Sequence, residues 1–202
     1  RRCPSRAGDR LLRGVDTARA RAMPGVRAVV TGEDCAIAYG VIPIAQNEFP
    51  LARDRVRYRG EPLAAVAADD AATAQAALAA IELDLEPLPA YFDAASARAE
   101  GAVQLHEGKP GNLERAVEQT FGDVDGGFAA ADLVREHTFH YAEVNHAMME
   151  PNAAVAHWDA ERGRLTLHSV TQVPYYVHLA LARCLQLDES AIRVVKPFVG
   201  GG

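Results

Sequence analysis

The alternation of apolar and polar residues over the first ninety positions predicts a small unit of strands packed against one helix. Residues 26–31 form a short apolar run that a glycine ends, which is typical of a buried strand. Residues 56–68 predict two strands separated by the Gly-Glu-Pro sequence at 60–62. The alanine-rich residues 71–80 favour a helix, and residues 81–88 alternate apolar with acidic side chains, as in a strand with one solvated face. This order of elements indicates a small α/β unit.

The pattern changes after a segment that is rich in glycine and proline. Residues 91–112 contain these residues around one short alanine-rich stretch, which is typical of a connection between domains. We therefore predict a first domain at residues 1–90, a linker at 91–112 and a second domain at 113–202.

The second domain is predicted to contain an extended segment, a strand pair and a helix followed by a strand. Residues 133–144 are rich in Val, Thr, Phe, His and Tyr, which favours an extended backbone. Residues 153–158 and 165–170 predict two strands joined by a polar turn. A proline suited to a first helical turn opens a predicted helix at 174–187, and the apolar residues 192–195 predict a strand.

Composition and charge exclude several classes of protein. Hydrophobic residues make up 49% of the chain, which is enough for a packed core, and the net charge of −6 argues against a nucleic-acid partner, since phosphate binding needs a basic face. No apolar run approaches the roughly 18 residues of a membrane span. The cysteines, Cys3, Cys35 and Cys184, are far apart and form no CxxC sequence. We expect no disulfide framework, zinc site or iron–sulfur cluster in this chain, and a reducing, cytoplasmic setting.

Both ends of the sequence resemble cut points. The chain has no initiator methionine, and it stops at Gly200–Gly202, directly after a predicted strand. A triple glycine after a strand usually leads into a functional turn. We therefore expect the chain to be an internal piece of a longer protein.

The histidines do not predict a metal site. His137 and His140 are three residues apart in an apparent strand, so they point to opposite faces and cannot share one ion. His157 and His168 could meet only across the predicted strand pair. The sequence also contains no GxGxxG, GxxxxGK[ST], GxSxG or HExxH motif. We expect these histidines to be surface or core residues, and we name no metal ligand.

A dense cluster of polar and soft side chains precedes Pro151. It contains His146, Met148, Met149 and Glu150. One interpretation is a strand end and turn whose methionines fill gaps in the core. The other is a functional cluster, because a buried glutamate there would need a partner.

Two polar features follow predicted strands of the second domain. Gln172 lies between a strand and a helix, where it could donate one hydrogen bond and accept another, or could cap the helix. Gly200, Gly201 and Gly202 follow the last strand, and successive glycines let backbone N–H groups converge on an anion or an oxo group.

Three stretches together resemble one family. Residues 46–78 are similar to the α/β hammerhead domain of the xanthine dehydrogenase/aldehyde oxidase family of molybdenum enzymes. Residues 143–159, with His146 and Glu150 in a His-x-x-x-Glu pattern, resemble the opening of that family's molybdenum-cofactor domain, and residues 171–202 resemble its continuation. The resemblance begins near residue 25, and the first two dozen residues match poorly.

The resemblance implies an α+β fold: a hammerhead domain followed by the first part of a mixed α/β molybdenum-cofactor-binding domain. It implies that Gln172 hydrogen-bonds near the molybdenum oxo ligand and that the amides of Gly200, Gly201 and Gly202 face the cofactor. It places no catalytic residue in this chain. The implied cofactor is molybdopterin in its cytosine dinucleotide form, with iron–sulfur clusters and FAD carried by partner subunits.

The resemblance also implies a class of reaction. Residues 40–62 and 171–186 are most similar to the 4-hydroxybenzoyl-CoA reductase branch of the family, which implies reductive removal of a ring hydroxyl from an aromatic CoA thioester. The alternative within the family is hydroxylation of a purine, an aldehyde or an N-heterocycle. An alternative of another class is a non-catalytic hammerhead-type module for binding or assembly.

Overall fold

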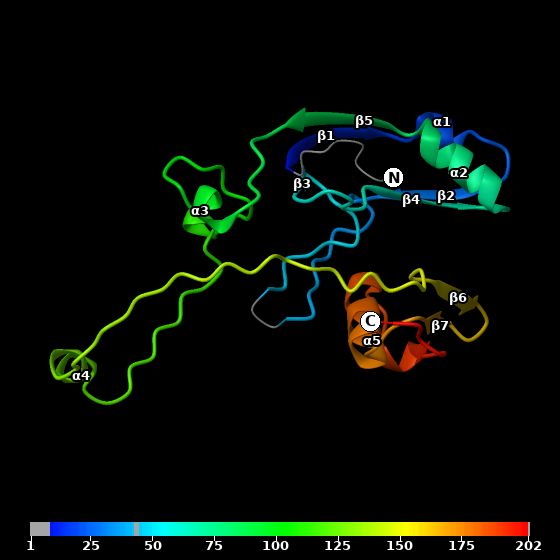
Figure 1. Ribbon diagram of the computed structural model, residues 1–202. Coiled ribbons are helices and arrows are strands. Elements are labelled where there is room, and N and C mark those ends of the chain that lie inside the picture. The colour runs from blue at the N-terminus through cyan, green and yellow to red at the C-terminus, as the bar shows by residue number, and fades with distance from the viewer. Residues whose placement is uncertain (1–8, 43–44, 202) are drawn as a thin grey trace.

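The structure is a computed structural model that describes residues 9–42 and 45–201, and it contains two folded units and one projecting arm (Figure 1). The first unit extends to the end of the strand at residue 87, and the second begins at residue 154. Residues 91–112, here called the strap, pack beside the first unit, and residues 113–149, here called the arm, project away from both units and return to the second unit near Met148.

The first unit is built from short strands and two helices. Its elements are β1 (Arg10–Asp16), α1 (Ala18–Arg21), β2 (Val26–Thr31), β3 (Arg55–Val56), β4 (Ala64–Ala68), α2 (Ala71–Ala80) and β5 (Glu82–Pro87). The antiparallel strands form one sheet in the order β3-β1-β5 and a separate β2-β4 pair. These bounds confirm the predicted strands at 26–31 and 81–88 and the predicted helix at 71–80.

Helix α2 begins where an aspartate caps it. The Asp70 carboxylate accepts hydrogen bonds from the backbone N–H and the hydroxyl of Thr73, each at 2.8 Å. Such a cap satisfies one of the amides that the first helical turn leaves without a partner. The neighbouring Asp69 instead forms an ion pair with Arg27 on β2 at 2.6 Å.

Strand β1 and helix α1 are elements that the sequence pattern did not predict. The more important of the two is β1. It lies between β3 and β5, and its pairing with β5 shifts register between Leu12 and Gly14. A bulge of this kind places an extra residue on one strand, so the two-residue period of the side chains is lost. The sequence analysis assigned no element to the first two dozen residues, yet β1 is the middle strand of its sheet.

Two small apolar clusters form the core of the first unit. One contains the fully buried Ile81 and Ala77 packed against Val29 of β2, and the other contains Val56 and Leu63. The acidic residues of β5 alternate with Leu83 and Leu85, which pack against these clusters, so one face of the strand is solvated as predicted. The core of the first unit is thus formed by the inner faces of short strands together with one face of helix α2.

A buried ion pair connects the start of β1 with β3. Asp9 is 2% exposed, and its carboxylate accepts hydrogen bonds from Nε and Nη2 of Arg55, the first at 2.6 Å. This geometry is bidentate, which makes charge-assisted bonds strong and specific. The hydrogen bond to Asp9 raises the pKa of Arg55 above its usual value, so the guanidinium is charged at every accessible pH.

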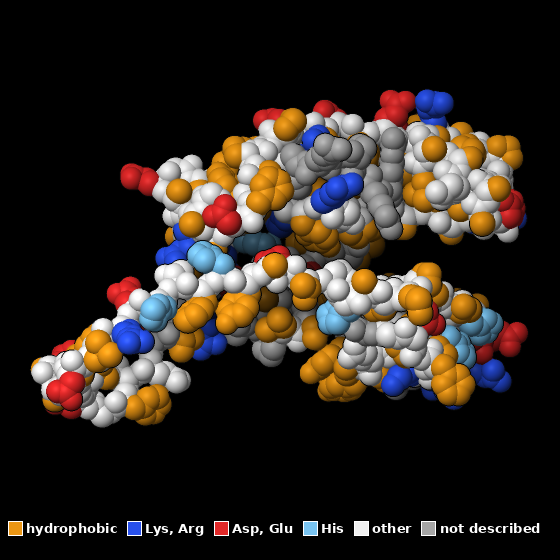
Figure 2. Space-filling view, viewed as in Figure 1, with side chains coloured by type: hydrophobic (Ala, Val, Ile, Leu, Met, Phe, Trp, Pro, Cys, Tyr) orange, Lys and Arg blue, Asp and Glu red, His pale blue; other side chains and the backbone are white. Residues whose placement is uncertain are grey.

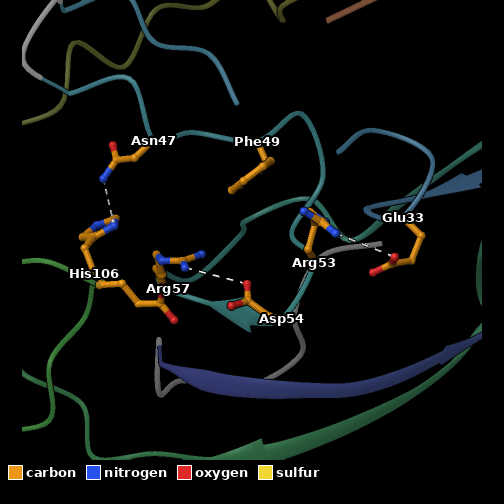
Figure 3. Close-up of a pocket in the computed structure, with 8 residues that line it drawn as sticks. Glu33, Asn47, Phe49, Arg53, Asp54, Arg57 and His106 are labelled. Carbon is orange, nitrogen blue, oxygen red and sulfur yellow. Dashed lines mark hydrogen bonds and ion pairs between the residues drawn. The ribbon is translucent and has the colours of Figure 1, made fainter. Parts of the chain in front are cut away.

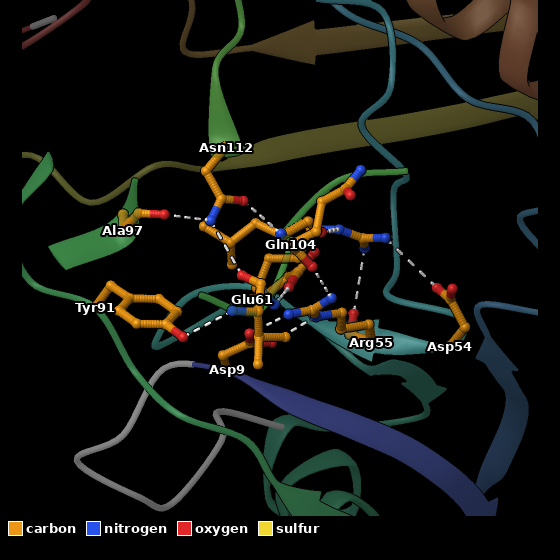
Figure 4. Close-up of polar contacts among 11 residues, drawn as sticks. Asp9, Asp54, Arg55, Glu61, Tyr91, Ala97, Gln104 and Asn112 are labelled. Carbon is orange, nitrogen blue, oxygen red and sulfur yellow. Dashed lines mark hydrogen bonds and ion pairs between the residues drawn. The ribbon is translucent and has the colours of Figure 1, made fainter. Parts of the chain in front are cut away.

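Two arginines of the first unit hold the strap by donating hydrogen bonds to its backbone carbonyls. Arg55 Nη1 donates to the Gln104 carbonyl at 2.5 Å, and Arg57 Nε donates to the Leu105 carbonyl at 3.3 Å (Figure 4). Within the strap, the Asn112 side chain donates to the Ala97 carbonyl at 2.7 Å and accepts from the Leu105 amide at 2.7 Å. The segment predicted as a linker therefore follows a fixed path, with the short helices α3 (Ala94–Ala97) and η1 (Pro110–Asn112).

The arm is exposed along its whole length. It contains one short helix, α4 (Val124–Ala129), and two extended legs. Figure 2 shows apolar side chains on its surface, and Phe121, Phe139 and Tyr141 are each more than 70% exposed. The predicted extended segment at 133–144 has an extended backbone but pairs with no strand in the described residues.

The second unit is a three-stranded sheet with one helix. Its elements are β6 (Ala154–Asp159), β7 (Arg164–Ser169), α5 (Pro174–Leu185), η2 (Glu189–Ala191) and β8 (Ile192–Val195). The strand order is β6-β7-β8; β6 pairs with β7 antiparallel, and β7 pairs with β8 parallel through the crossover helix α5. The predicted strand pair, helix and final strand are all confirmed.

Helix α5 also contacts the first unit. Arg183 Nη1 donates to the side-chain oxygen of Gln46 at 2.6 Å, and the Cys184 thiol lies 3.7 Å from the Ile37 carbonyl oxygen. These contacts connect the loop after β2 with the helix that spans the second sheet. In the described part of the chain, none of the helices has the length and hydrophobicity needed to cross a bilayer.

Removing the Asp9 carboxylate should destabilise the first unit strongly. In the Asp9→Ala variant, Arg55 keeps its charge at a site where its own side chain is 13% exposed. Breaking a buried pair in this way costs about 3–5 kcal/mol, so the free energy of unfolding measured with urea should fall by about 3 kcal/mol. The control is Glu86→Ala, which removes the exposed partner of Arg13 and should cost less than about 1 kcal/mol. Equal losses in the two variants would contradict the buried-pair account.

Ionisation of Glu61 should cost stability at neutral pH. Glu61 is 9% exposed, and burial raises its pKa above 4.5 although the Arg57 amide donates to its carboxylate at 2.5 Å. A raised pKa for an acid means that the folded chain binds more protons than the unfolded chain, so stability falls as pH rises above about 4.5. Glu61→Gln keeps an acceptor for Arg57 and removes the ionisation.

The measurement is the difference in melting temperature between Glu61→Gln and the unaltered chain, taken at several pH values. We expect this difference to become more positive between pH 4.5 and pH 7. A difference that stays constant or becomes more negative over this range would show that the ionised carboxylate is stabilised by its surroundings.

Candidate functional site

The topology of the second sheet brings three connections to one edge. Strands β7 and β8 are parallel, so the turns that follow them leave from the same edge, and β6 starts there because it is antiparallel to β7. The register agrees: Ala154 pairs with Ser169 and His168 pairs with Val195. Ligands of open α/β sheets bind outside the carboxyl ends of the strands. We call this region the sheet edge.

The glycine loop after β8 packs against the segment that precedes β6. The Gly200 amide donates a hydrogen bond to the Glu150 carboxylate. A Cβ added to Gly200 would lie 2.9 Å from Cβ of Glu150, and one added to Gly201 would lie 2.6 Å from Cβ of Met148. Neither position has room for a side chain. Gly201 also has a φ of 138°, which favours glycine.

Gln172 lies at the same edge, in the turn between β7 and α5. Its side chain is exposed, and the residue at the N-cap position of α5 is Val173, without a side-chain capping bond. The turn is held instead by the Thr171 hydroxyl, which accepts from the Val173 amide at 3.3 Å. The side-chain amide of Gln172 is therefore not used as a helix cap.

The structure thus places Gln172, Gly200 and Gly201 at one edge of the sheet, as the topology requires. Gly202 lies outside the described residues. The roles predicted for all four residues toward a cofactor stay predictions.

The cluster before Pro151 divides into two groups. Met148 and Glu150 face the glycine loop, whereas Met149 is 96% exposed and His146 is also exposed. An Asx turn directs the chain here: the Asn145 side chain accepts from the Ala147 amide at 2.7 Å. Sequence reasoning selected the cluster but not its partner. The available signal was the pair of adjacent glycines, which indicates that another segment approaches the main chain closely. Only the fold shows that this segment contains Met148 and Glu150.

The described histidines and cysteines do not gather into a metal site. His157 pairs with Thr166 and His168 pairs with Val155, so the two histidines are not directly opposite each other. Within residues 9–42 and 45–201, no group of three His, Cys, Asp or Glu side chains has the arrangement of metal ligands. Cys35 and Cys184 are free thiols, and burial raises the pKa of both.

The first unit contains a polar cavity of about 380 Å³ beside the strap (Figure 3). Its arginines already have acidic neighbours: Arg53 lies 3.8 Å from Glu33, and Arg57 lies 3.8 Å from Asp54. His106 of the strap shares a hydrogen bond of 3.1 Å with Asn47.

Burial, helped by the nearby charge of Arg57, lowers the pKa of His106, so this imidazole is neutral at pH 7. The cavity wall carries charges of both signs, and it includes His106 and Glu107 of the strap. We interpret it as a polar seam that closes the first unit. The sheet edge, with a bare main chain and an unused side-chain amide, is the better candidate for a ligand site.

The groups that the sheet edge offers to a ligand, an amide side chain and backbone amides, are neutral hydrogen-bonding groups. A glutamine amide can donate to one atom and accept from another, and glycines let backbone amides approach a ligand without steric hindrance. The Glu150 carboxylate at this edge accepts from the Gly200 amide. The arrangement can orient an oxygen-rich group but contains no paired nucleophile and base.

Comparison with known proteins assigns both halves of the chain to one family. Residues 5–89 match the a/b hammerhead domain of aldehyde oxidase and xanthine dehydrogenase, and residues 105–202 match the molybdopterin cofactor-binding domain. The hammerhead match includes β1, which agrees with its central place in the sheet.

Several relatives match nearly the whole chain. Nicotine 6-hydroxylase large subunit from Paenarthrobacter nicotinovorans is 36% identical over 95% of this chain and 24% of its own length. The nicotinate dehydrogenase large molybdopterin subunit from Eubacterium barkeri is 33% identical over 93% of this chain and 44% of its own length. Among solved structures, quinoline 2-oxidoreductase from Pseudomonas putida 86 superimposes with a TM-score of 0.84 and 29% identity, over 100% of this chain and 26% of that chain.

The chain therefore spans between about a quarter and under half of the length of these relatives. The predicted fold class, a hammerhead domain followed by a molybdenum-cofactor-binding domain, is confirmed. The chain belongs to the xanthine dehydrogenase/aldehyde oxidase family, and its two parts correspond to the hammerhead and cofactor-binding domains of the family's molybdopterin-binding subunit.

Proposed function

We propose that this chain helps to hold a molybdenum cofactor in the large subunit of an oxidoreductase. The observation that carries the proposal is the parallel pairing of β7 and β8, which makes the turn that contains Gln172 and the glycine loop leave the sheet at the same edge. The cofactor, when bound, supplies the redox chemistry. The protein's part is to bind and orient it.

The residues at the sheet edge fit such a group. The exposed Gln172 amide is neutral and is not used as a helix cap, so it can hydrogen-bond to cofactor oxygens without adding charge. The main chain at Gly201 has no side chain to obstruct a ligand. Gly200 differs, because its N–H already donates to Glu150. We therefore assign cofactor contact to Gln172, Gly201 and Gly202, and a role in loop support to Gly200.

The reaction we favour is hydroxylation of an N-heterocycle. Nicotine, nicotinate and quinoline, named in three of the relatives, are all N-heterocyclic compounds. From the family resemblance we also propose that an iron–sulfur subunit and an FAD subunit carry the electrons and that the cofactor is the cytosine dinucleotide form of molybdopterin. The free thiols of Cys35 and Cys184 suit the cytoplasm.

Reductive dehydroxylation of 4-hydroxybenzoyl-CoA to benzoyl-CoA is the second candidate. It is favoured by the sequence of residues 40–62 and 171–186. Part of this likeness lies at the contact between the two units, because Arg183 Nη1 donates to the Gln46 side chain, and another part includes Gln172 at the sheet edge. A non-catalytic hammerhead module is disfavoured, because the match to the cofactor-binding domain covers residues 105–202.

A substrate comparison with the intact complex separates the two reactions. We expect the complex to oxidise an N-heterocycle such as nicotinate or quinoline with an artificial electron acceptor, and to leave 4-hydroxybenzoyl-CoA unchanged with a low-potential electron donor. The measurement is product formation by liquid chromatography. Formation of benzoyl-CoA, with no oxidation of either heterocycle, would reverse the assignment.

Gln172→Ala in the intact enzyme should reduce kcat/KM by about 10- to 1000-fold, because it removes a hydrogen bond aimed at the reacting centre. The melting temperature should change little, because the side chain is exposed. Gln75→Ala, an exposed glutamine on α2 in the first unit, is the matched control and should leave both quantities unchanged. Full activity in the Gln172→Ala enzyme would remove Gln172 from the site.

A further inference from the structure

Glu150 is the one carboxylate that the described structure brings to the glycine loop. It lies just before Pro151, on the segment that leads from the arm into β6, fifty residues from the loop. Its carboxylate accepts from the Gly200 amide, and no lysine or arginine of the described residues forms an ion pair with it. The hydrogen bond from the Gly200 amide is therefore the polar contact that the structure shows for the Glu150 carboxylate.

The close approach of the two segments depends on both partners. Oε2 of Glu150 would lie 2.8 Å from a Cβ at Gly200, and Met148 occupies the corresponding space at Gly201. Positions 200 and 201 thus require glycine because residues 148–150 leave no room for a side chain there, whether or not a ligand binds the loop. This gives a physical reason for glycine at both positions that is separate from access to a ligand.

A glycine-rich loop needs such a partner. Glycine loses more conformational freedom on ordering than any other residue, so a run of glycines keeps one path only if other groups hold it. A hydrogen bond to an ionised carboxylate is about twice as strong as one between neutral groups. The loop after β8 has no side chain of its own at Gly200 or Gly201 that could fix its path.

We propose that Glu150 is a positioning residue: its carboxylate holds the loop after β8 so that the main chain at Gly201 faces the sheet edge beside Gln172. The hold on the loop is a property of this chain alone. Its consequence for the cofactor rests on the proposed function. Glu150 acts through Gly200 and is not itself assigned any contact with cofactor or substrate.

The direct test is hydrogen–deuterium exchange, measured by mass spectrometry on peptides that cover residues 196–201. The 202-residue chain is compared as the unaltered protein, Glu150→Ala and Glu150→Gln. We expect Glu150→Ala to speed exchange of the Gly200 amide by about 10-fold, because the acceptor is lost. Glu150→Gln keeps a neutral acceptor and should give an intermediate rate. Glu143→Ala, which removes an exposed glutamate from the arm, should leave the rate unchanged.

If Glu150 were needed for the fold of the whole second unit, Glu150→Ala would also unfold that unit. Exchange of the β7 amides is therefore followed in the same experiment. We expect protection of β7 to stay the same in Glu150→Ala. Unchanged exchange at residues 196–201 in Glu150→Ala would overturn the inference. So would equal loss of protection in β7, because the effect would then be global.

The consequence for the cofactor is tested separately in the intact enzyme. Molybdenum content by mass spectrometry should fall several-fold in Glu150→Ala and be largely restored in Glu150→Gln. Faster loop exchange together with unchanged molybdenum content in both Glu150→Ala and Gln172→Ala would overturn the proposed function while leaving the hold on the loop established. Failure of the two claims is thereby distinguished.

Discussion

The parallel pairing of β7 with β8 is the constraint on which the candidate site depends. Because α5 crosses over between them, the turns that follow both strands leave the sheet at the same edge, and the antiparallel β6 begins there. Residues separated by fifty positions in the sequence, Glu150 and Gly200, meet as a result. Reversal of any one strand would send its connection to the opposite edge.

The first unit contributes rigidity rather than chemistry. Its buried pair of Asp9 and Arg55 fixes the start of β1 against β3, and Arg55 also donates to the strap at Gln104. Contacts of Arg183 and Cys184 with the loop after β2 then connect this unit to α5. The helix that leads away from Gln172 is thereby braced from its C-terminal end.

The regular elements followed from the sequence because their signals are local. The alanines of α2, the cap at Asp70 and the alternation in β5 each determine their structure within a few residues. Strand β1 was missed because a bulge interrupts its period, and its position depends on pairing with residues seventy positions away. The partner of the glycine loop was missed for the same reason: a contact between Glu150 and Gly200 has no local signature.

The central claim is that the sheet edge holds the cofactor through a neutral amide and a bare main chain. A crystal structure of the intact enzyme with its cofactor tests this most directly, through the distances from the Gln172 side chain and the Gly201 amide to the nearest cofactor oxygens. Our account predicts hydrogen-bond distances of about 3 Å for both. A cofactor bound away from this edge, with Gln172 exposed to solvent, would contradict it.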